Sequence, residues 1–255
     1  DVLRRGNGCY PYFAADIAYH RNKLEVRGFD KAINIWGADH HGHVARLQAA
    51  LDGLGLDGSH RLVVVLMQLV NLMQDGKPVR MSKRSGKTIA LHDLLDEISV
   101  DAARYFFNSR ASTSPLDFDL DLAVREDSEN PVYYVQYAHA RICSLIARLA
   151  EEGAQVPKAG DVDAAVLNTP EELALIKALA QFPEEIHLAA RDYDPSRINR
   201  YLVALAGDFH RFYNACRIKG EEPQVLGARL KLADTVRSVL ANGMGLLGVS
   251  APEKM

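Results

Sequence analysis

The hydrophobic pattern divides the chain into a mixed α/β part followed by a purely helical part. In the first part, apolar runs at 10–13, 32–36 and 62–67 predict strands, and the segments 14–23 and 44–54 have helical spacing. A strand, a polar loop, a helix and a second strand in that order indicate an α/β sheet. In such sheets ligands bind at the carboxyl ends of the strands, so the polar loops that follow the strands are the first candidates for a site.

Beyond Thr88 the strand signal fades and the chain is predicted to be helical. Proline at a first-turn position opens one long helix at Asn130-Pro131, and a linker rich in glycine, proline and aspartate covers 153–169. The helices are expected at 91–109, 116–126, from 130 onward, and at 170–181, 183–190, 195–218 and 224–247. We therefore expect a helical bundle over 128–255, preceded by an α/β domain over 1–127.

Composition and charge limit the class of protein. The 255 residues are 48% hydrophobic and 25% charged, as in globular proteins, and with a net charge of -3 any nucleic-acid binding must use a local patch. Three scattered cysteines without CxxC spacing favour a reducing compartment and argue against structural zinc or disulfides. No apolar run reaches about 18 residues and the start lacks a signal-peptide pattern. We expect a cytoplasmic protein that binds neither membranes nor DNA.

The start of the chain also bears on its extent. Asp1 stands where an initiator methionine is expected, and the apolar run at 10–13 enters packed structure almost at once. These two features lead us to expect that the chain is a piece of a longer protein.

Two polar stretches follow predicted strands. Residues 37–43 come directly after the strand at 32–36, and residues 80–86 come after the run at 62–67 and an Asp75-Gly76 turn. The second stretch combines cations, two serines and a glycine, and such groups donate hydrogen bonds to a polyphosphate that gains charge during a reaction. A solvated basic turn explains the same composition equally well, so composition alone does not decide.

Three partial motifs lack the context that would give them a function. Residues 53–58 match GxGxxG but follow a helix, whereas a dinucleotide-binding loop follows a strand and opens a helix. Residues 86–88 imitate the end of a P-loop, but Met81 stands where its first glycine should be. Residues 39–43 hold three histidines and an aspartate in one turn without a distant fourth ligand, so we expect no protein-bound metal.

In combination, these stretches resemble the arginyl-tRNA synthetase family of class I aminoacyl-tRNA synthetases. Gly37-x-Asp39-x-x-x-His43 matches the GxDxxxH element of class I sheets, and residues 80–84 (RMSKR) match the KMSKS loop. The likeness runs nearly end to end, because the remaining matches are the arginine-pocket helix at 12–20 and the anticodon-binding domain at 130–141, 194–197, 212–217 and Met255.

The resemblance implies a fold and also marks two departures. It implies the C-terminal half of a Rossmann-like class I catalytic domain over 1–127, with the KMSKS-type loop and a helical connection, followed by a DALR-type helical anticodon-binding domain over 128–255. Arg80 replaces the first lysine of KMSKS and Arg84 its last serine. Arginine keeps the charge but not the compact lysine head. No HIGH-type motif occurs, so the chain carries half an active site and is expected to be inactive alone.

The activity implied by the resemblance is that of an arginine–tRNA ligase. ATP, with Mg²⁺, would activate L-arginine to arginyl-adenylate, and the arginyl group would pass to the 3′ end of tRNA(Arg). The residues implied to act on the pyrophosphate are Lys83, Ser82 and Arg80. Those implied to bind ATP are Gly37, Asp39, His40, His43, Met81, Ser82, Lys83 and Arg84. Those implied to bind arginine are Tyr12, Asp16 and Asp39. Those implied to bind the anticodon are Tyr134, Tyr137, Arg141, Tyr213, Arg217 and Met255.

Helical spacing supports some of these assignments and leaves others open. Asp16 lies four residues after Tyr12, and Arg217 lies four residues after Tyr213, so each pair is expected to share a helix face. Tyr134, Tyr137 and Arg141 share another face by their spacings of three and four. From the residues alone, the favoured explanations are that Tyr12 packs in the core, that Asp16 caps its helix and that the tyrosines pack in the bundle.

Other classes of protein remain open at this point. A tRNA-binding module without catalysis would use only the helical part, and a different class I enzyme such as cysteinyl-tRNA synthetase also has a helical anticodon domain. A metabolic nucleotidyltransferase would share the sheet but would not need the trailing helices. The expected partners are tRNA(Arg), L-arginine and ATP, and the family gives a monomer as the expected state.

Overall fold

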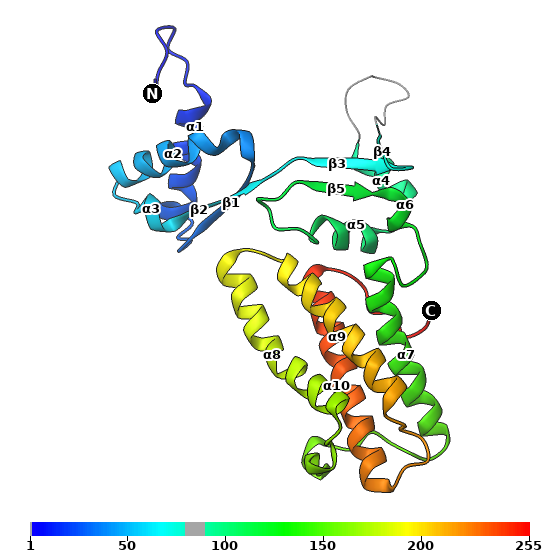
Figure 1. Cartoon of the computed structure of the whole chain (residues 1–255). Helices are drawn as coiled ribbons and strands as arrows, with labels where there is room; N and C mark the ends of the chain where they lie inside the picture. Colours follow the sequence, from blue (N-terminus) through cyan, green and yellow to red (C-terminus); the bar gives the residue numbers. More distant parts are fainter. Residues whose placement is uncertain (1, 80–89) are drawn as a thin grey trace. The chain divides into compact units, whose positions relative to one another are not determined.

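The protein is described by a computed structural model that covers residues 2–79 and 90–255 (Figure 1). It forms two compact units. Unit 1 comprises Asp1–Val70 and Ser112–Leu116, and unit 2 comprises Asn71–Ala111 and Asp117–Met255. This division groups residues by spatial contact, whereas the division between 127 and 128 separates two functions, and that second division stays a prediction.

From its first helix onward, unit 1 has the order of elements that the hydrophobic pattern predicts, namely helix, strand, helix and strand. Its strands β1 (Ala32–Gly37) and β2 (Leu62–Met67) pair in parallel, with Ala32 opposite Leu62 and Gly37 opposite Met67. Its helices are α1 (Tyr12–Arg21), a π-helical turn (Asn22–Val26), a 3-10 turn (Ala38–His40), α2 (His41–Gly53) and α3 (Gly58–Arg61). The strand expected at 10–13 is wrong, because Tyr12 and Phe13 already belong to α1.

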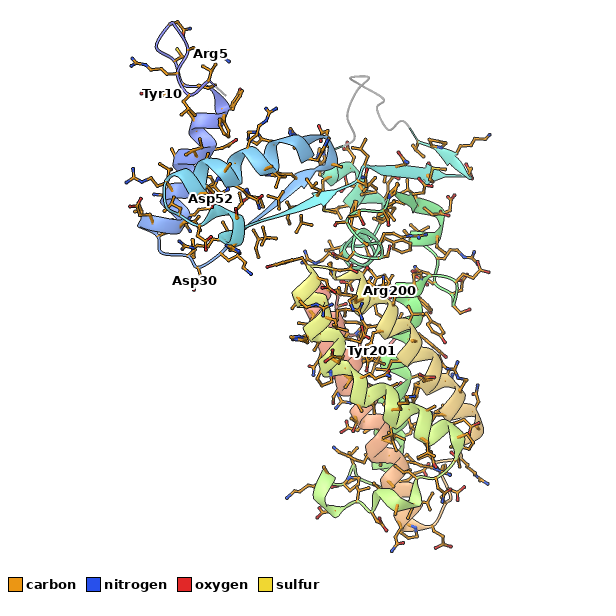
Figure 2. All side chains as sticks on the ribbon, turned by 60° about the vertical axis from the view of Figure 1, so that its left-hand side comes forward. Arg5, Tyr10, Asp30, Asp52, Arg200 and Tyr201 are labelled. Atoms are coloured by element: carbon orange, nitrogen blue, oxygen red, sulfur yellow. The ribbon has the colours of Figure 1, made fainter. Side chains whose placement is uncertain are left out.

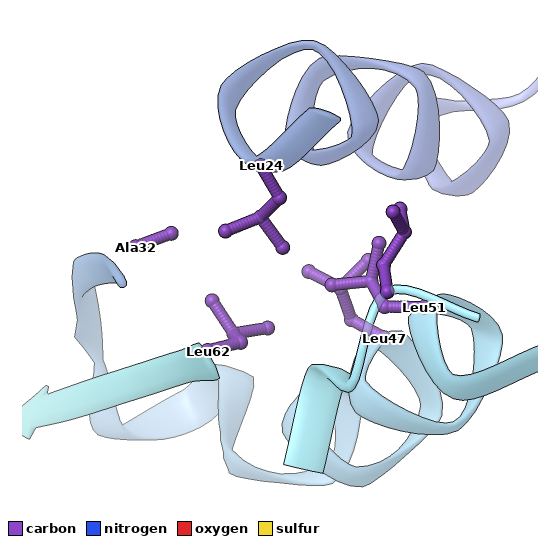
Figure 3. Close-up of a cluster of buried hydrophobic side chains, with 6 residues drawn as sticks. Leu24, Ala32, Leu47, Leu51 and Leu62 are labelled. Carbon is purple, nitrogen blue, oxygen red and sulfur yellow. The ribbon is translucent and has the colours of Figure 1, made fainter. Parts of the chain in front are cut away.

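A small leucine-rich core holds unit 1 together. Figure 3 shows Leu24 from the π-helical turn that follows α1, Leu47 and Leu51 from α2, and Ala32 and Leu62 from the starts of the two strands converging on one point. All five are buried. Because burying one such leucine is worth about 1.5–3 kcal/mol, this cluster fixes α1 and α2 against the strand pair. The two helices therefore present their polar residues at a defined place near the end of β1.

Unit 2 begins with a short sheet and small helices where two predictions fail. Strands β3 (Val70–Gln74), β4 (Lys77–Pro78) and β5 (Leu116–Asp119) form a sheet in the order β4-β3-β5. The helix expected at 91–109 is two helices, α4 (Leu91–Glu97) and α5 (Val100–Phe107), because the Ser99 side chain accepts a hydrogen bond from the Ala102 amide and starts a new helix. The helix expected at 116–126 begins as β5 and becomes helical only in α6 (Leu120–Ala123).

The rest of unit 2 is the expected helical bundle. Figure 1 shows its four long helices packed along one another, namely α7 (Pro131–Glu151), α8 (Pro170–Asp192), α9 (Ser196–Ala215) and α10 (Pro223–Leu247). The two helices predicted at 170–181 and 183–190 are one, since α8 continues through Pro183. Phe182 stacks on Tyr201 of α9 with ring centroids 5.3 Å apart, and Tyr201 donates a hydrogen bond to the Ala178 carbonyl. Tyr201 is labelled in Figure 2. These contacts join α8 to α9 next to Pro183, and the helix is continuous through the proline.

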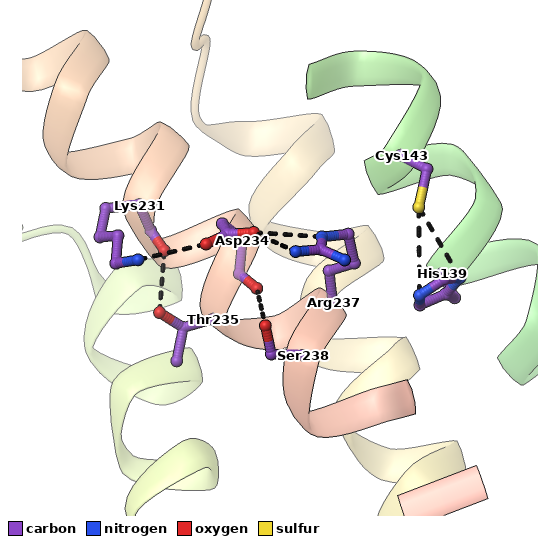
Figure 4. Close-up of polar contacts among 7 residues, drawn as sticks. All are labelled: His139, Cys143, Lys231, Asp234, Thr235, Arg237 and Ser238. Carbon is purple, nitrogen blue, oxygen red and sulfur yellow. Dashed lines mark hydrogen bonds and ion pairs between the residues drawn. The ribbon is translucent and has the colours of Figure 1, made fainter. Parts of the chain in front are cut away.

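Close packing fixes α9 and α10 relative to one another, and polar contacts within α10 stabilise that helix. Gly243 of α10 faces Leu202 of α9 so closely that a Cβ atom would lie 2.6 Å from a leucine methyl, so the two helices meet at this glycine. On α10 the carboxylate of Asp234 accepts hydrogen bonds from Lys231 and Arg237 (Figure 4). The bundle is therefore a firm support for the side chains it carries.

Candidate functional site

The predicted phosphate-binding loop lies outside the described residues. Arg80, Met81, Ser82, Lys83 and Arg84 all belong to the stretch 80–89, so their assigned roles stay predictions. The remaining candidates fall into two groups, one at the end of β1 in unit 1 and one on the bundle in unit 2.

At the end of β1 the chain turns sharply through the GxDxxxH element. Gly37 closes the strand, Ala38 to His40 form a 3-10 turn, and α2 starts at His41. A Cβ atom at Gly37 would lie 2.5 Å from a carboxylate oxygen of Asp39, so a larger residue here would displace the Asp39 side chain from its present position. Asp39 and His40 are largely exposed, with 3.7 Å between the carboxylate and the imidazole. Both side chains are available to a ligand at the end of β1, and α/β sheets bind their ligands at the carboxyl ends of the strands.

The structure brings Asp16 and His43 together at the same place. Nε2 of His43 lies 3.2 Å from Oδ2 of Asp16, which joins α2 to α1. The His43 ring is held by Phe13, edge-on at 5.3 Å, and by Trp36 at 5.6 Å. Asp16 keeps 43% of its side chain exposed, so a ligand can still reach its carboxylate.

The competing explanations for Tyr12 and Asp16 do not hold. Tyr12 is 90% exposed, so it does not pack in the core. The helix begins after Pro11, and Asp16 stands in the middle of α1 rather than at its cap. An exposed tyrosine and a half-exposed carboxylate one turn apart form a surface that can receive a cationic side chain, by hydrogen bonding to the carboxylate and by contact with the ring.

His20 was not predicted from the sequence, and it holds the helical turn that carries Asp16. His20 is only 3% exposed, its Nδ1 donates to the Asp16 carbonyl at 2.7 Å, and its Nε2 accepts from the side-chain amide of Asn34 at 2.7 Å. The Asn34 oxygen accepts in turn from Lys23 at 3.3 Å. This network ties the turn of α1 that carries Asp16 to β1. The sequence does contain a signal for this network, because the polar residues His20 and Asn34 stand at positions that the hydrophobic pattern assigns to a buried face.

On the bundle, three of the predicted residues share one face of α7, as their spacing requires. Tyr134, Tyr137 and Arg141 lie there, and 41% of the Tyr137 side chain is exposed. The Arg141 guanidinium sits 4.2 Å from the centroid of the Tyr213 ring on α9. This cation–π contact places the Arg141 charge and the rings of Tyr137 and Tyr213 at the junction of α7 and α9.

A pocket of about 500 Å³ opens beside this junction, and we call it the terminal pocket. Its lining consists of Tyr137, Ala140, Arg141, Ser144, Arg148, Tyr213 and Met255. Met255 reaches it because the C-terminal tail is fastened to the bundle. Gln136 donates to the Ser250 carbonyl at 3.0 Å, and His139 donates to the Pro252 carbonyl at 2.9 Å. The predicted grouping of tyrosines, arginine and the terminal methionine is thus present in space.

Arg217 is not part of this group. The prediction that it shares a helix face with Tyr213 is wrong, because α9 ends at Ala215 and Cys216 is extended. Beyond that point the chain turns away and four-residue spacing no longer brings side chains together. Arg217 is exposed, and its carbonyl accepts a hydrogen bond from Arg229 at 2.5 Å.

Next to the terminal pocket lies a second one of about 430 Å³, which we call the histidine pocket. Its lining consists of Ser128, Tyr133, Tyr134, Tyr137, Arg141, His210 and Asn214. His210 and Asn214 were not identified from the sequence, because the pattern along α9 marks 195–218 only as helix.

A metal-binding cluster and a membrane-spanning helix are both absent from the described residues. Over 2–79 and 90–255, the histidines, cysteines and carboxylates do not gather in groups of three or more that could hold a metal ion. Among the helices within those same limits, none is both long and apolar enough to cross a bilayer.

Two family models match the chain, one over its first half and one over its second half. Residues 1–118 match the model described as tRNA synthetases class I (R), catalytic domain. Residues 135–255 match the model described as DALR anticodon binding domain.

Curated relatives and solved structures agree with these matches. The chain is 55% identical over its whole length to a protein named arginine–tRNA ligase from Ruminiclostridium cellulolyticum and 56% identical to one of that name from Carboxydothermus hydrogenoformans. It covers 45% of each, so it spans about half the length of the curated relatives it matches.

Among solved structures, a protein described as an arginyl-tRNA synthetase from Campylobacter jejuni superposes with a TM-score of 0.88 at 37% identity. The match covers 100% of this chain and 54% of that one. The Thermus thermophilus arginyl-tRNA synthetase has the same fold over 100% of this chain and 51% of its own, with a TM-score of 0.85 at 22% identity.

Proposed function

Because this chain belongs to the arginyl-tRNA synthetase family of class I aminoacyl-tRNA synthetases, we propose that it serves the arginine–tRNA ligase reaction. In this reaction ATP activates L-arginine to arginyl-adenylate, and the arginyl group then passes to the 3′ end of tRNA(Arg). The observation that carries the proposal is the group formed by Tyr137, Arg141, Tyr213 and Met255 on the bundle, since aromatic and arginine surfaces suit unstacked bases.

In the activation step, the arginine carboxylate attacks the α-phosphate of ATP and pyrophosphate leaves. Asp16 would hold the substrate guanidinium, with its carboxylate oriented by His43 and its helical turn by His20. Tyr12 and Asp39 would complete the arginine site, and Gly37 would let the nucleotide approach the end of β1. Magnesium would enter with ATP, because Mg²⁺ binds mainly through phosphate oxygens and water and neutralises phosphate charge there.

The KMSKS-type loop would stabilise the charge that develops on pyrophosphate. Lys83 aligns with the second lysine of the motif, and Arg80, Ser82 and Arg84 would add donors around it. Such a step is accelerated mainly by positioning and by fixed positive charge, so the loop would act without covalent chemistry.

Replacing Lys83 by alanine in an arginine–tRNA ligase that contains this chain should therefore slow adenylate formation. Loss of one preorganised donor lowers such rates by about 10²–10³. ATP–pyrophosphate exchange measures this step, and binding of tRNA(Arg) should not change. Lys77→Ala, an exposed lysine on β4, is the matched control and should keep both properties. Near-normal exchange in the Lys83 variant would show that Lys83 does not contribute to adenylate formation.

The anticodon-binding role of the bundle can be tested on this chain directly. Arg141→Ala should weaken binding of tRNA(Arg) by about 1–3 kcal/mol, because it removes both a planar surface and the charge beside Tyr213. Binding to tRNA(Arg) and to a form altered at the middle anticodon base should be measured at one salt concentration, since phosphate contacts depend on salt. Arg191→Ala, an exposed arginine on α8, should leave both affinities unchanged. Equal affinity of the wild-type chain for both tRNAs would contradict the role.

The remaining parts of the proposal concern the state of the protein. We propose that it works as a monomer in the cytoplasm, a compartment consistent with three unpaired cysteines. A tRNA-binding module without catalysis would give the same result in the tRNA experiment, but it would show no ATP–pyrophosphate exchange for the Lys83 substitution to slow.

A further inference from the structure

A chain of hydrogen bonds links the π-helical turn after α1 to the backbone of Asp16. The ammonium of Lys23 donates to the side-chain oxygen of Asn34 at 3.3 Å, and the NH₂ group of Asn34 donates to Nε2 of His20 at 2.7 Å. Nδ1 of His20 donates in turn to the carbonyl of Asp16 at 2.7 Å. The hydrogen bonds therefore run from the π-helical turn through β1 to α1.

The two ends of this chain of hydrogen bonds fix the direction of every bond in it. An ammonium has no acceptor, so the oxygen of Asn34 faces Lys23 and its NH₂ group faces His20. The NH₂ group has no acceptor either, so Nε2 of His20 is unprotonated and the ring proton lies on Nδ1, opposite the Asp16 carbonyl. The imidazole therefore accepts at one edge and donates at the other, and an apolar side chain at this position would break the chain of hydrogen bonds in the middle.

His20 is enclosed by the protein in this position. It is 3% exposed, and its ring contacts that of Tyr19 edge-on, with the centroids 6.0 Å apart. The Lys23 ammonium lies 4.4 Å from the centroid of the same Tyr19 ring, so a cation–π contact also holds the first donor. Hydrogen bonds shielded from water are stronger and polarise one another. These bonds therefore tie the turn of α1 that carries Asp16 to β1.

The same strand also fixes the carboxylate of Asp16. Asn34 and Trp36 are two residues apart on β1, so their side chains lie on one face of the strand. Trp36 contacts the ring of His43 at 5.6 Å, and Nε2 of His43 lies 3.2 Å from the Asp16 carboxylate. Asn34 acts on the Asp16 carbonyl through His20. Both the backbone and the side chain of Asp16 are thus held from β1, which sets the direction of the carboxylate as well as its position.

The direction of a carboxylate matters for one kind of cation more than for another. A guanidinium is planar and binds a carboxylate through two parallel N–H groups, so both oxygens must lie in its plane. An ammonium is a compact charge with three rotatable donors and binds a carboxylate from many directions. Holding the Asp16 carboxylate in one orientation therefore favours an arginine side chain over a lysine side chain.

We propose that His20 is a positioning residue that determines the preference of the Asp16 site for arginine over lysine. His20 does not bind the substrate, because it is buried and bonds the backbone carbonyl of Asp16 rather than its carboxylate. It acts by keeping the Asp16 turn in the orientation that a guanidinium needs. The inference rests on the proposed function, in which Asp16 binds the substrate guanidinium, and it adds the residue on which selectivity among cationic amino acids depends.

The test compares His20→Leu with the wild-type sequence in an arginine–tRNA ligase that contains this chain. Leucine fills the buried position but has neither nitrogen. ATP–pyrophosphate exchange with tRNA(Arg) present gives the maximal rate and the KM for arginine, and L-lysine added as a competitor gives its inhibition constant. His60→Leu, at an exposed histidine on α3, is the matched control and should keep the wild-type values. Circular dichroism verifies that each variant is folded.

We expect the KM for arginine of His20→Leu to rise about 10- to 100-fold, whereas its maximal rate and its inhibition constant for lysine should change less than about threefold. The preference for arginine over lysine should fall accordingly. Asn34→Ala breaks the link to β1 but leaves the bond between His20 and Asp16, so it should lower the preference less, by about 3- to 10-fold. It replaces His20→Leu if that variant does not fold.

Two results would overturn the inference and leave the proposed function intact. One is a folded His20→Leu enzyme that keeps the wild-type KM for arginine. The other is an equal weakening of arginine and lysine, because it would show that the chain of hydrogen bonds supports only the fold. A wild-type enzyme that supports no exchange with arginine, or that prefers lysine, would overturn the proposed function and this inference with it.

Discussion

Replacement of Glu172 by alanine is expected to lower the free energy of unfolding of the chain by about 3–5 kcal/mol, because it removes the closest carboxylate from the buried guanidinium of Arg229 and leaves only Glu221, at 3.6 Å. Glu172 is fully buried, and its Oε1 accepts from Nε of Arg229 at 2.6 Å, where only 12% of the arginine side chain is exposed. Its Oε2 accepts from the backbone amides of Asn168 and Thr169 and closes the capping box of α8. One substitution therefore removes an ion pair and a helix cap together.

The electrostatics of the site agree with this expectation. Burial raises the pKa of the Glu172 carboxyl, but hydrogen bonds from Thr169 and Arg229 outweigh burial, and the net pKa is lowered. A carboxyl with a lowered pKa in the folded state contributes stability above its unfolded pKa and loses it as the pH falls through the folded value. The wild-type chain should therefore lose more stability than the alanine variant on acidification below about pH 4.5.

Urea denaturation of three variants separates the ion pair from the cap. Glu171→Ala, one residue earlier in the same first turn, is the matched control and should lose less than about 1 kcal/mol, since it removes only a charge near the helix start. The double variant Glu172→Ala with Arg229→Leu should be more stable than Glu172→Ala alone, because no buried charge then remains unpaired. A Glu172 variant that unfolds at the wild-type urea concentration would show that the pair contributes nothing to stability.

The parts of the fold that the sequence predicts well are those where one buried face sets the pattern. The strands at 32–37 and 62–67 are apolar runs, and α7 begins where Asn130 and Pro131 provide a cap and a first turn. The predictions fail where contacts distant in sequence decide. The alternation that begins at Leu116 is too short to separate a strand from a helix start, and the stacking of Phe182 on α9 keeps one helix where Pro183 suggested two.

The sites show the same limit. Resemblance named Asp16 and His43 separately, but their hydrogen bond depends on how α1 packs against α2, which no local pattern contains. Spacing placed Arg217 beside Tyr213 only by assuming that α9 continues, and the helix ends two residues before it. His210 was missed because a single histidine in a helical pattern carries no signal until the tertiary structure surrounds it with tyrosines.

Asp16→Asn is expected to weaken arginine binding by about 2–5 kcal/mol, roughly 30-fold or more, in a ligase that contains this chain. A carboxylate accepts the two parallel N–H groups of a guanidinium, whereas an asparagine offers one oxygen and one NH₂ group. His43 already donates to one oxygen of Asp16, and in the variant it would fix the amide oxygen on its own side. The NH₂ group would then face the donors of the substrate, so attraction would become repulsion.

The measurement is ATP–pyrophosphate exchange as a function of arginine and, separately, of ATP. The Asp16 carboxylate lies on α1, contacts His43 and would repel phosphate, so it is not expected to bind ATP. The concentration of ATP needed for half-maximal rate should therefore change by less than about threefold, well under 1 kcal/mol. Asp30→Asn, at an exposed carboxylate in unit 1 (Figure 2), should leave both dependences unchanged. If the variant lost arginine and ATP binding equally, Asp16 would be holding the turn at the end of β1 rather than the substrate, and the guanidinium would need another anchor, for which the exposed Asp39 carboxylate is the next candidate.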